Sequence, residues 1–297
     1  MPDINLLPVG FYDAYGSKAE LSYKLNGKII DYLLDNDFKL FIPSPVEYED
    51  ITTLSSNQKF RVLDPLSDKI LTIRSDITTQ AIRALSYTKD DYVQICYSGV
   101  VLRLNIDQNN HARSLKQAGF EIMTKDLNSE IEKDALQHLL NLMQSINSDS
   151  YSIVFSSTLS KSLLREICGF SENDLLEIIT KNDLDRVFNN SKIEDLRSIL
   201  SPKRIDFFTK KQYLNYDSII VNYFDSISQI AKNLPSILHS RFIFDPLNLK
   251  SSNYNSGSFF TIIDKVTGNI IIRGGEYKIK GWGKGYGASF YLEEIIT

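Results

Sequence analysis

The sequence predicts an α+β fold in which antiparallel strands are interrupted by a block of helices. The stretch Val93–Met123 has the pattern of a strand, a hairpin and a returning strand. Ser258–Asp264 and Asn269–Arg273 form a second strand pair around a Thr-Gly-Asn turn. Between these pairs, residues from about 159 to 234 have helical periodicity, so we expect a helical insertion there.

The chain begins with an amphipathic helix. Residues Lys18–Asn36 carry leucine and isoleucine at helical spacing, and Ser17 is expected to cap this helix. Phe38–Ile42 is then expected to form a strand that ends before a proline. Two further short strands are expected at Phe60–Leu63 and Lys69–Ile73.

A strand that ends at Arg74 is followed by the start of a helix. Ser75 or Asp76 is expected to begin this helix. In one interpretation Asp76 is a simple N-cap. In the other, Asp76 takes an ammonium group, while Arg74 and the helix N-terminus take a carboxylate. These residues alone leave both interpretations open.

The returning strand of the central hairpin carries polar groups on one face. Period two places Gln117, Gly119 and Glu121 on one side and core residues such as Phe120 on the other. Gly119 is expected to leave room for a ligand above the sheet. With Arg103 on the outgoing strand, this face suits a zwitterion or a phosphate. The alternative is a solvated sheet face without a ligand.

The remaining elements complete an alternation of strands and helices. A helix is expected at Ile131–Met143 and a short strand at Ser152–Phe155. After the helical block, a strand is expected at Arg241–Phe244. Glycines cluster from Gly274 to Gly287 before a final strand and helix, which indicates close backbone packing.

Composition limits the classes of function. The chain has 297 residues, enough for one large domain or two ordinary ones, and 42% of them are hydrophobic. A net charge of −4 does not indicate a basic surface for nucleic acid or an anionic membrane. No leader peptide or membrane span is expected either. Cys96 and Cys168 suggest structural thiols in the cytoplasm. The three histidines lack the spacing of metal ligands, so we expect no metal and no cofactor.

Several stretches together resemble the class II aminoacyl-tRNA synthetase core, in its histidyl branch. RSDITTQAIRA resembles the RPEGT-type segment, and YSGVVLRLN with ARSLKQAGFEIM resembles the motif 2 hairpin. FDPLNLKSSNYNSGSFF resembles the histidine-binding segment, and GYGASFYLEEI resembles motif 3. The resemblance implies one core domain over residues 1–297 with the helical insertion, and no anticodon-binding domain. It also implies an antiparallel sheet flanked by helices.

Three departures from the synthetase motifs affect the expected function. Glu294 stands where motif 3 has an arginine that holds ATP, and Asn105 stands where motif 2 has a glutamate. Lys250 replaces the histidine-specific arginine and cannot make the same bidentate contact. We therefore expect no catalytic residues for adenylation.

Groups suited to an amino acid remain, as expected for the synthetase-like regulatory subunits of short-form ATP phosphoribosyltransferase. That family activates a short catalytic subunit that joins ATP to phosphoribosyl pyrophosphate, and it mediates feedback inhibition by histidine. The resemblance implies a homodimer within a hetero-oligomer, such as a hetero-octamer. It also implies a histidine site made by Asp76, Thr78, Arg103, Gln117, Glu121 and Tyr254.

Two other hypotheses remain for this chain. One is an enzyme, either a histidyl-tRNA synthetase or an amino-acid ligase that uses the same adenylating core. The other is a structural relative that binds no ligand. Exchange of pyrophosphate into ATP distinguishes the first, and calorimetry with histidine distinguishes the second.

Overall fold

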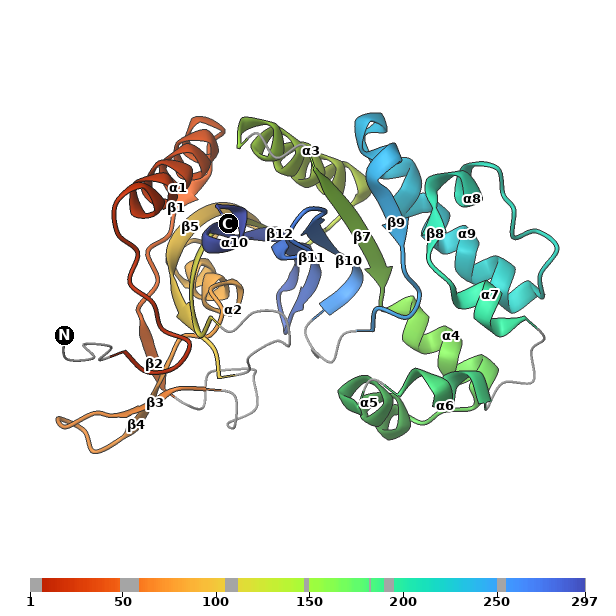
Figure 1. Ribbon diagram of the computed structural model, residues 1–297, viewed down its shortest axis with the longest axis horizontal. Helices are drawn as coiled ribbons and strands as arrows, with labels where there is room; N and C mark the ends of the chain where they lie inside the picture. Colours follow the sequence, from red (N-terminus) through yellow and green to blue (C-terminus); the bar gives the residue numbers. More distant parts are fainter. Residues whose placement is uncertain are drawn as a thin grey trace, which may run out of the picture.

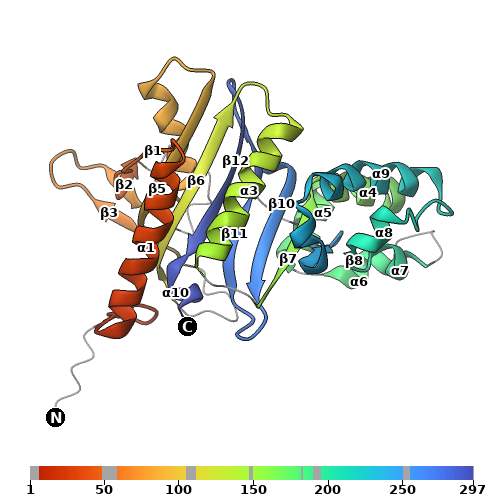
Figure 2. The same cartoon turned by 90° about the horizontal axis from the view of Figure 1, so that it is seen from above.

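The computed structural model describes residues 7–48, 59–104, 112–146, 150–181, 183–189, 195–249 and 255–296. These residues form a large central sheet with helices on both faces and a helical lobe at one edge (Figures 1 and 2). The expected α+β class with its sheet and flanking helices is confirmed.

The central sheet has nine strands in the order β1-β5-β6-β12-β11-β10-β7-β9-β8. Neighbouring strands run antiparallel except in the pairs β1–β5 and β7–β9, which are parallel. The bounds are β1 Lys39–Leu40, β5 Tyr92–Leu102, β6 Ser114–Thr124, β7 Tyr151–Ser157, β8 Lys203–Arg204, β9 Phe242–Phe244, β10 Asn255–Asp264, β11 Ile270–Ile279 and β12 Gly283–Tyr291.

One face of this sheet carries the main hydrophobic core. Helices α1 (Ser17–Asp35) and α3 (Ser129–Ser145) lie across it (Figure 2). Phe120 of β6 is buried there, with its ring 5.5 Å from that of Phe38. Apolar residues at helical spacing on both helices contact the alternate residues of the strands, so the expected core face of β6 is confirmed.

The opposite face is covered at the β5–β6 end by a short helical segment, α2 (Thr78–Ala81) followed by the 3₁₀ helix η3 (Ile82–Tyr87). A separate three-stranded sheet lies beside it, made of β2 (Val46–Tyr48), β3 (Arg61–Leu63) and β4 (Ile70–Ile73). Arg74 joins this small sheet to the large one, because its guanidinium donates hydrogen bonds to the carbonyl oxygens of Val100 and Pro43.

The helical lobe lies beyond β7 and β9 (Figure 1). Its aromatic core includes Phe207, Phe208, Tyr213 and Phe224, with ring centroids 4.9 Å apart for Phe207 and Phe224. The helices are α4 (Leu159–Cys168), α5 (Glu172–Lys181), α6 (Leu184–Asn189), α7 (Leu196–Leu200), α8 (Ile205–Thr209), α9 (Ser218–Asn233) and the 3₁₀ helix η4 (Ser236–Arg241).

Some details of the elements differ from the expectations. Ser17 is the first helical residue rather than the cap, because Gly16 takes the cap position with φ of 63°. The block from 159 to 234 is not entirely helical, since β8 pairs with β9 at the sheet edge. β11 continues past Arg273 to Ile279, and its glycines permit close strand packing there.

Candidate functional site

The polar face of β6 is buried rather than solvated. Gln117 and Glu121 are each about 1% exposed and lie on the face opposite the main core. Tyr97 of β5 and Ser289 of β12 are the register neighbours of Gly119, which lies between them. The alternative of a solvated sheet face is therefore wrong.

Gly119 does not leave room for a ligand, so that prediction is wrong. A Cβ atom at this position would meet the phenol of Tyr97 and the carbonyl oxygen of Ala288. Tyr97 is completely buried, and its ring occupies the space that the missing side chain leaves. The glycine is needed for close packing of the protein with itself.

The Glu121 carboxyl is the centre of the site. Its Oε1 accepts a hydrogen bond of 3.2 Å from the Tyr97 hydroxyl, which is also 2.8 Å from Ser289 Oγ. Its Oε2 has no hydrogen bond of good geometry among the described residues. A Cβ atom on Gly287, the register partner on β12, would overlap Oε2, so only glycine fits opposite this carboxyl.

Burial raises the pKa of Glu121 to about 8. The negative charge of Asp76 raises this pKa further, while the hydroxyls of Thr78, Tyr277 and Tyr97 oppose the shift. Burial and the Glu121 charge also raise the pKa of Tyr97 well above its usual value. A buried carboxyl beside a second acid is suited to receive a cationic group.

Asp76 and Thr78 reach this site from the start of α2. Asp76 Oδ1 accepts a hydrogen bond of 3.1 Å from the Thr78 backbone N–H, but Ile77 occupies the N-cap position of α2, so the prediction that Ser75 or Asp76 caps this helix is wrong. The electrostatic effect of Asp76 on Glu121 and Tyr97 shows that it also lies near both groups. Asp76 is therefore not a simple N-cap, and its contact with an ammonium group stays a prediction.

Arg103 lies at the other end of the same face. Its Nε donates to the Ser75 carbonyl oxygen at 3.1 Å, and its Nη2 donates to the Tyr291 hydroxyl at 3.4 Å. Tyr291 is the register partner of Gln117, so Arg103 and Gln117 flank one aromatic ring. The structure thus brings five of the six predicted residues onto one face, and Tyr254 lies outside the described residues.

Sequence reasoning missed Tyr97, Ser289 and Tyr291. Tyr97 shares the period-two face of β5 with Gly99, so strand alternation could have suggested it. Ser289 and Tyr291 come from a strand far away in the chain, and only the β6–β12 register places them here.

Of the three residues that depart from the synthetase motifs, the structure describes Glu294. Glu294 is half-buried on α10 (Leu292–Ile295), directly after β12. Glu293 on the same helix accepts a hydrogen bond of 2.9 Å from the Lys116 backbone N–H, which ties α10 to β6. Asn105 and Lys250 lie outside the described residues.

Within the described ranges, every helix is too short or too polar to span a membrane. Within the same ranges, no group of three or more histidine, cysteine, aspartate or glutamate side chains could hold a metal ion.

The fold and this polar face define a class II synthetase-like protein, and comparison with known proteins agrees. A family model described as histidyl-tRNA synthetase matches residues 10–295, so the chain belongs to that family. Histidyl-tRNA synthetase from Nostoc has the same fold, with a TM-score of 0.73, 15% identity, and coverage of 98% of this chain and 74% of that one.

Relatives within this family have a more particular name, ATP phosphoribosyltransferase regulatory subunit. One from Acinetobacter baumannii is 24% identical over 92% of this chain and 75% of its own length. Another from Gluconobacter oxydans is 22% identical over 93% of this chain and 76% of its own length. A Bacillus halodurans structure named ATP phosphoribosyltransferase regulatory subunit/histidyl-tRNA synthetase has a TM-score of 0.82, with 15% identity, and covers 100% of this chain and 83% of that one.

The raised pKa of Glu121 predicts a pH-dependent stability. The unfolded carboxyl ionises near its usual pKa of 4.5, whereas the folded one stays protonated up to about 8. The native state thus binds more protons in this window, and Glu121 makes the free energy of unfolding fall as pH rises. The free energy of unfolding of Glu121→Gln minus that of the wild type should therefore increase with pH. The increase should be up to ~1.4 kcal/mol per pH unit between about pH 5 and pH 8.

Urea unfolding at several pH values measures this difference. Glu166→Gln is the control, because Glu166 is exposed on α4 and this variant makes the same replacement outside the site. A difference for Glu121→Gln that does not change with pH would contradict a buried, protonated Glu121.

Proposed function

We propose that this chain is a regulatory subunit of a short-form ATP phosphoribosyltransferase and has no turnover of its own. It activates the catalytic subunit and makes that subunit sensitive to inhibition by histidine. One observation carries the proposal: polar groups suited to an amino acid remain in the sequence, while Glu294 stands where the synthetase motif has a cation. The names of the relatives support the same assignment.

Histidine is the proposed effector, and each of its charged groups has a complement. Its ammonium group lies between Asp76 and Glu121, and its carboxylate faces Arg103. Gln117 and Thr78 supply neutral polar groups on the same face, and we assign Tyr254 to the imidazole. Binding of the cation stabilises ionised Glu121, so the affinity for histidine should increase as pH rises toward about 8.

We further infer a homodimer within a hetero-oligomer, such as a hetero-octamer, with helices α4–α9 as an insertion in one core domain. Large apolar side chains are exposed in the single chain on α1, on the strand edge beside it and on the small sheet. Such side chains are expected on a surface that a second subunit covers. They include Leu21, Tyr23, Leu34, Leu40, Ile42, Val46, Leu63 and Ile70. The free thiols Cys96 and Cys168 are consistent with a reducing compartment such as the cytoplasm.

The alternative is a working histidyl-tRNA synthetase or amino-acid ligase, which the names of several structural neighbours favour. The isolated chain should show no histidine-dependent exchange of pyrophosphate into ATP, because Glu294 repels the phosphates. A bacterial histidyl-tRNA synthetase assayed in parallel is the positive control. Turnover well above the blank would rule out the regulatory assignment.

Loss of either acid should weaken histidine binding. A hydrogen bond to a charged group contributes about 1.5–3 kcal/mol, so Glu121→Ala or Asp76→Ala should raise the Kd roughly ten- to a hundredfold. Calorimetry measures the Kd, and co-purification with the catalytic subunit tests that assembly is kept. In the complex, more histidine should be needed for inhibition.

Glu166→Ala on α4 is the matched control for these variants, since it removes an exposed carboxylate far along the chain from the site. Wild-type histidine binding in both Glu121→Ala and Asp76→Ala would place the effector elsewhere, even if the regulatory function holds. Absence of any binding to the wild-type chain would favour a structural relative without a ligand.

The assembly prediction concerns α1. Leu21 is 50% exposed there, and a carboxylate at this position should weaken a dimer by desolvation in an apolar interface. Light scattering should show at least a dimer for the wild-type chain and a larger monomer fraction for Leu21→Asp. Leu176→Asp is the control, because Leu176 is 51% exposed on α5 of the helical lobe. A wild-type monomer, alone and with the catalytic subunit, would refute this interface.

A further inference from the structure

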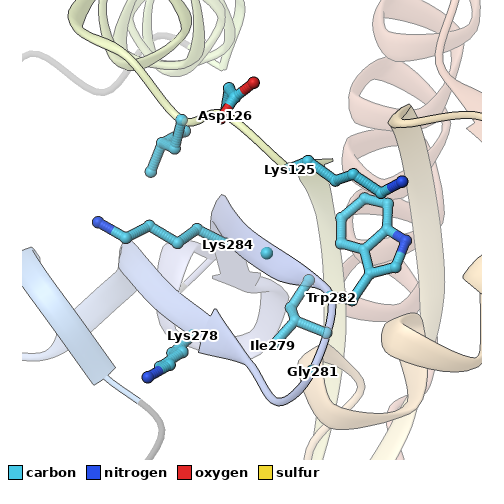
Figure 3. Close-up of a pocket in the computed structure, with 9 residues that line it drawn as sticks. Lys125, Asp126, Lys278, Ile279, Gly281, Trp282 and Lys284 are labelled. Atoms are coloured by element: carbon cyan, nitrogen blue, oxygen red, sulfur yellow. The ribbon is translucent and has the colours of Figure 1, made fainter.

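A recess lies at one end of the sheet, away from the residues of the proposed histidine site. It is formed by the turn between β11 and β12 and by the segment that leads from β6 to α3 (Figure 3). Its volume is about 420 Å³, within the range of sites for small molecules. The lining residues are Lys125, Asp126, Leu127, Lys278, Ile279, Gly281, Trp282, Gly283 and Lys284.

Three lysines and one carboxylate, that of Asp126, line this recess, so cationic side chains outnumber anionic ones there although the whole chain has a net charge of −4. Lys278 and Lys284 are direct register partners on β11 and β12, an arrangement in which like charges repel. Lys284 is 2.8 Å from Glu276, whereas no described carboxylate forms a salt bridge with the exposed Lys278. An anion between the two strands would relieve the repulsion.

Lys125 approaches from the other wall of the recess (Figure 3). Its ammonium lies 2.6 Å from Asp91, and both side chains are at least half exposed. Exposed ion pairs contribute little, so Lys125 can exchange this partner for a ligand anion at small cost.

The recess also contains a fixed aromatic ring. Trp282 is the single tryptophan of the chain, and it packs against the buried cluster that includes Ala81 and Ile279. Its backbone N–H donates to the Ile279 carbonyl oxygen at 3.1 Å, which closes the turn. Gly283 allows the turn to approach the Thr124 carbonyl oxygen, where a Cβ atom would clash. The ring is therefore held in place at the wall of the recess (Figure 3).

We propose that this recess binds a nucleoside phosphate. Lysine ammonium groups bind phosphate oxygens, and a tryptophan face stacks on a nucleobase. The ammonium groups of Lys278 and Lys284 lie at one end of the recess and the Trp282 ring at the other (Figure 3), so the phosphate and the base would occupy opposite ends. The assignment uses none of the residues of the histidine site and does not depend on the proposed function.

The intrinsic fluorescence of Trp282 reports binding directly, because no other tryptophan contributes. AMP should change this fluorescence in a saturable way and bind roughly tenfold or more tightly than either adenosine or inorganic phosphate alone. Lys278→Ala should weaken AMP binding roughly three- to tenfold, and added salt should weaken it as well.

Lys280→Ala is the matched control, since Lys280 is an exposed lysine of the same turn that does not line the recess. It should bind AMP as wild type does. Calorimetry of Trp282→Phe provides a second readout, with circular dichroism to show that the variant is folded. The proposal is overturned by an absence of saturable binding, by equal affinity for phosphate and AMP, or by equal effects of Lys278→Ala and Lys280→Ala.

Discussion

The burial of the Glu121 carboxyl is the constraint on which the site depends. Taking a carboxylate out of water is unfavourable unless hydrogen bonds or a positive charge compensate it. Here the Tyr97 hydroxyl supplies one hydrogen bond, and Oε2 is left without one of good geometry among the described residues. The nearby Asp76 makes ionisation still less favourable, so burial and this charge together raise the pKa and favour the protonated acid.

The sheet explains how such a group can be held in place. One face of β6 belongs to the main core with α1 and α3, so the strand cannot rotate to expose Glu121. On the other face, Tyr97 packs over Gly119, and Gly287 gives the carboxyl its space. Under the proposed function, the ammonium group of a bound ligand would favour the ionised form of this one buried group.

The sequence predicted the helices, most strands and the face of β6 because these follow from local periodicity. It could also place Gln117 and Glu121 together, since they are four residues apart on one strand. It could not predict their burial or the role of Gly119, because both depend on how β5 and β12 align with β6. The cap at Ser17 was wrong for a different reason, since Gly16 adopts the positive φ that the entry to α1 requires.

Infrared difference spectroscopy of the histidine-bound and free chain tests the protonation of Glu121 most directly. If histidine converts a protonated Glu121 into a carboxylate, the carbonyl stretch of one buried carboxylic acid should disappear on binding at neutral pH. The same band should be absent from Glu121→Gln with and without histidine. A wild-type chain that binds histidine but keeps this band, or never shows it, would contradict the account.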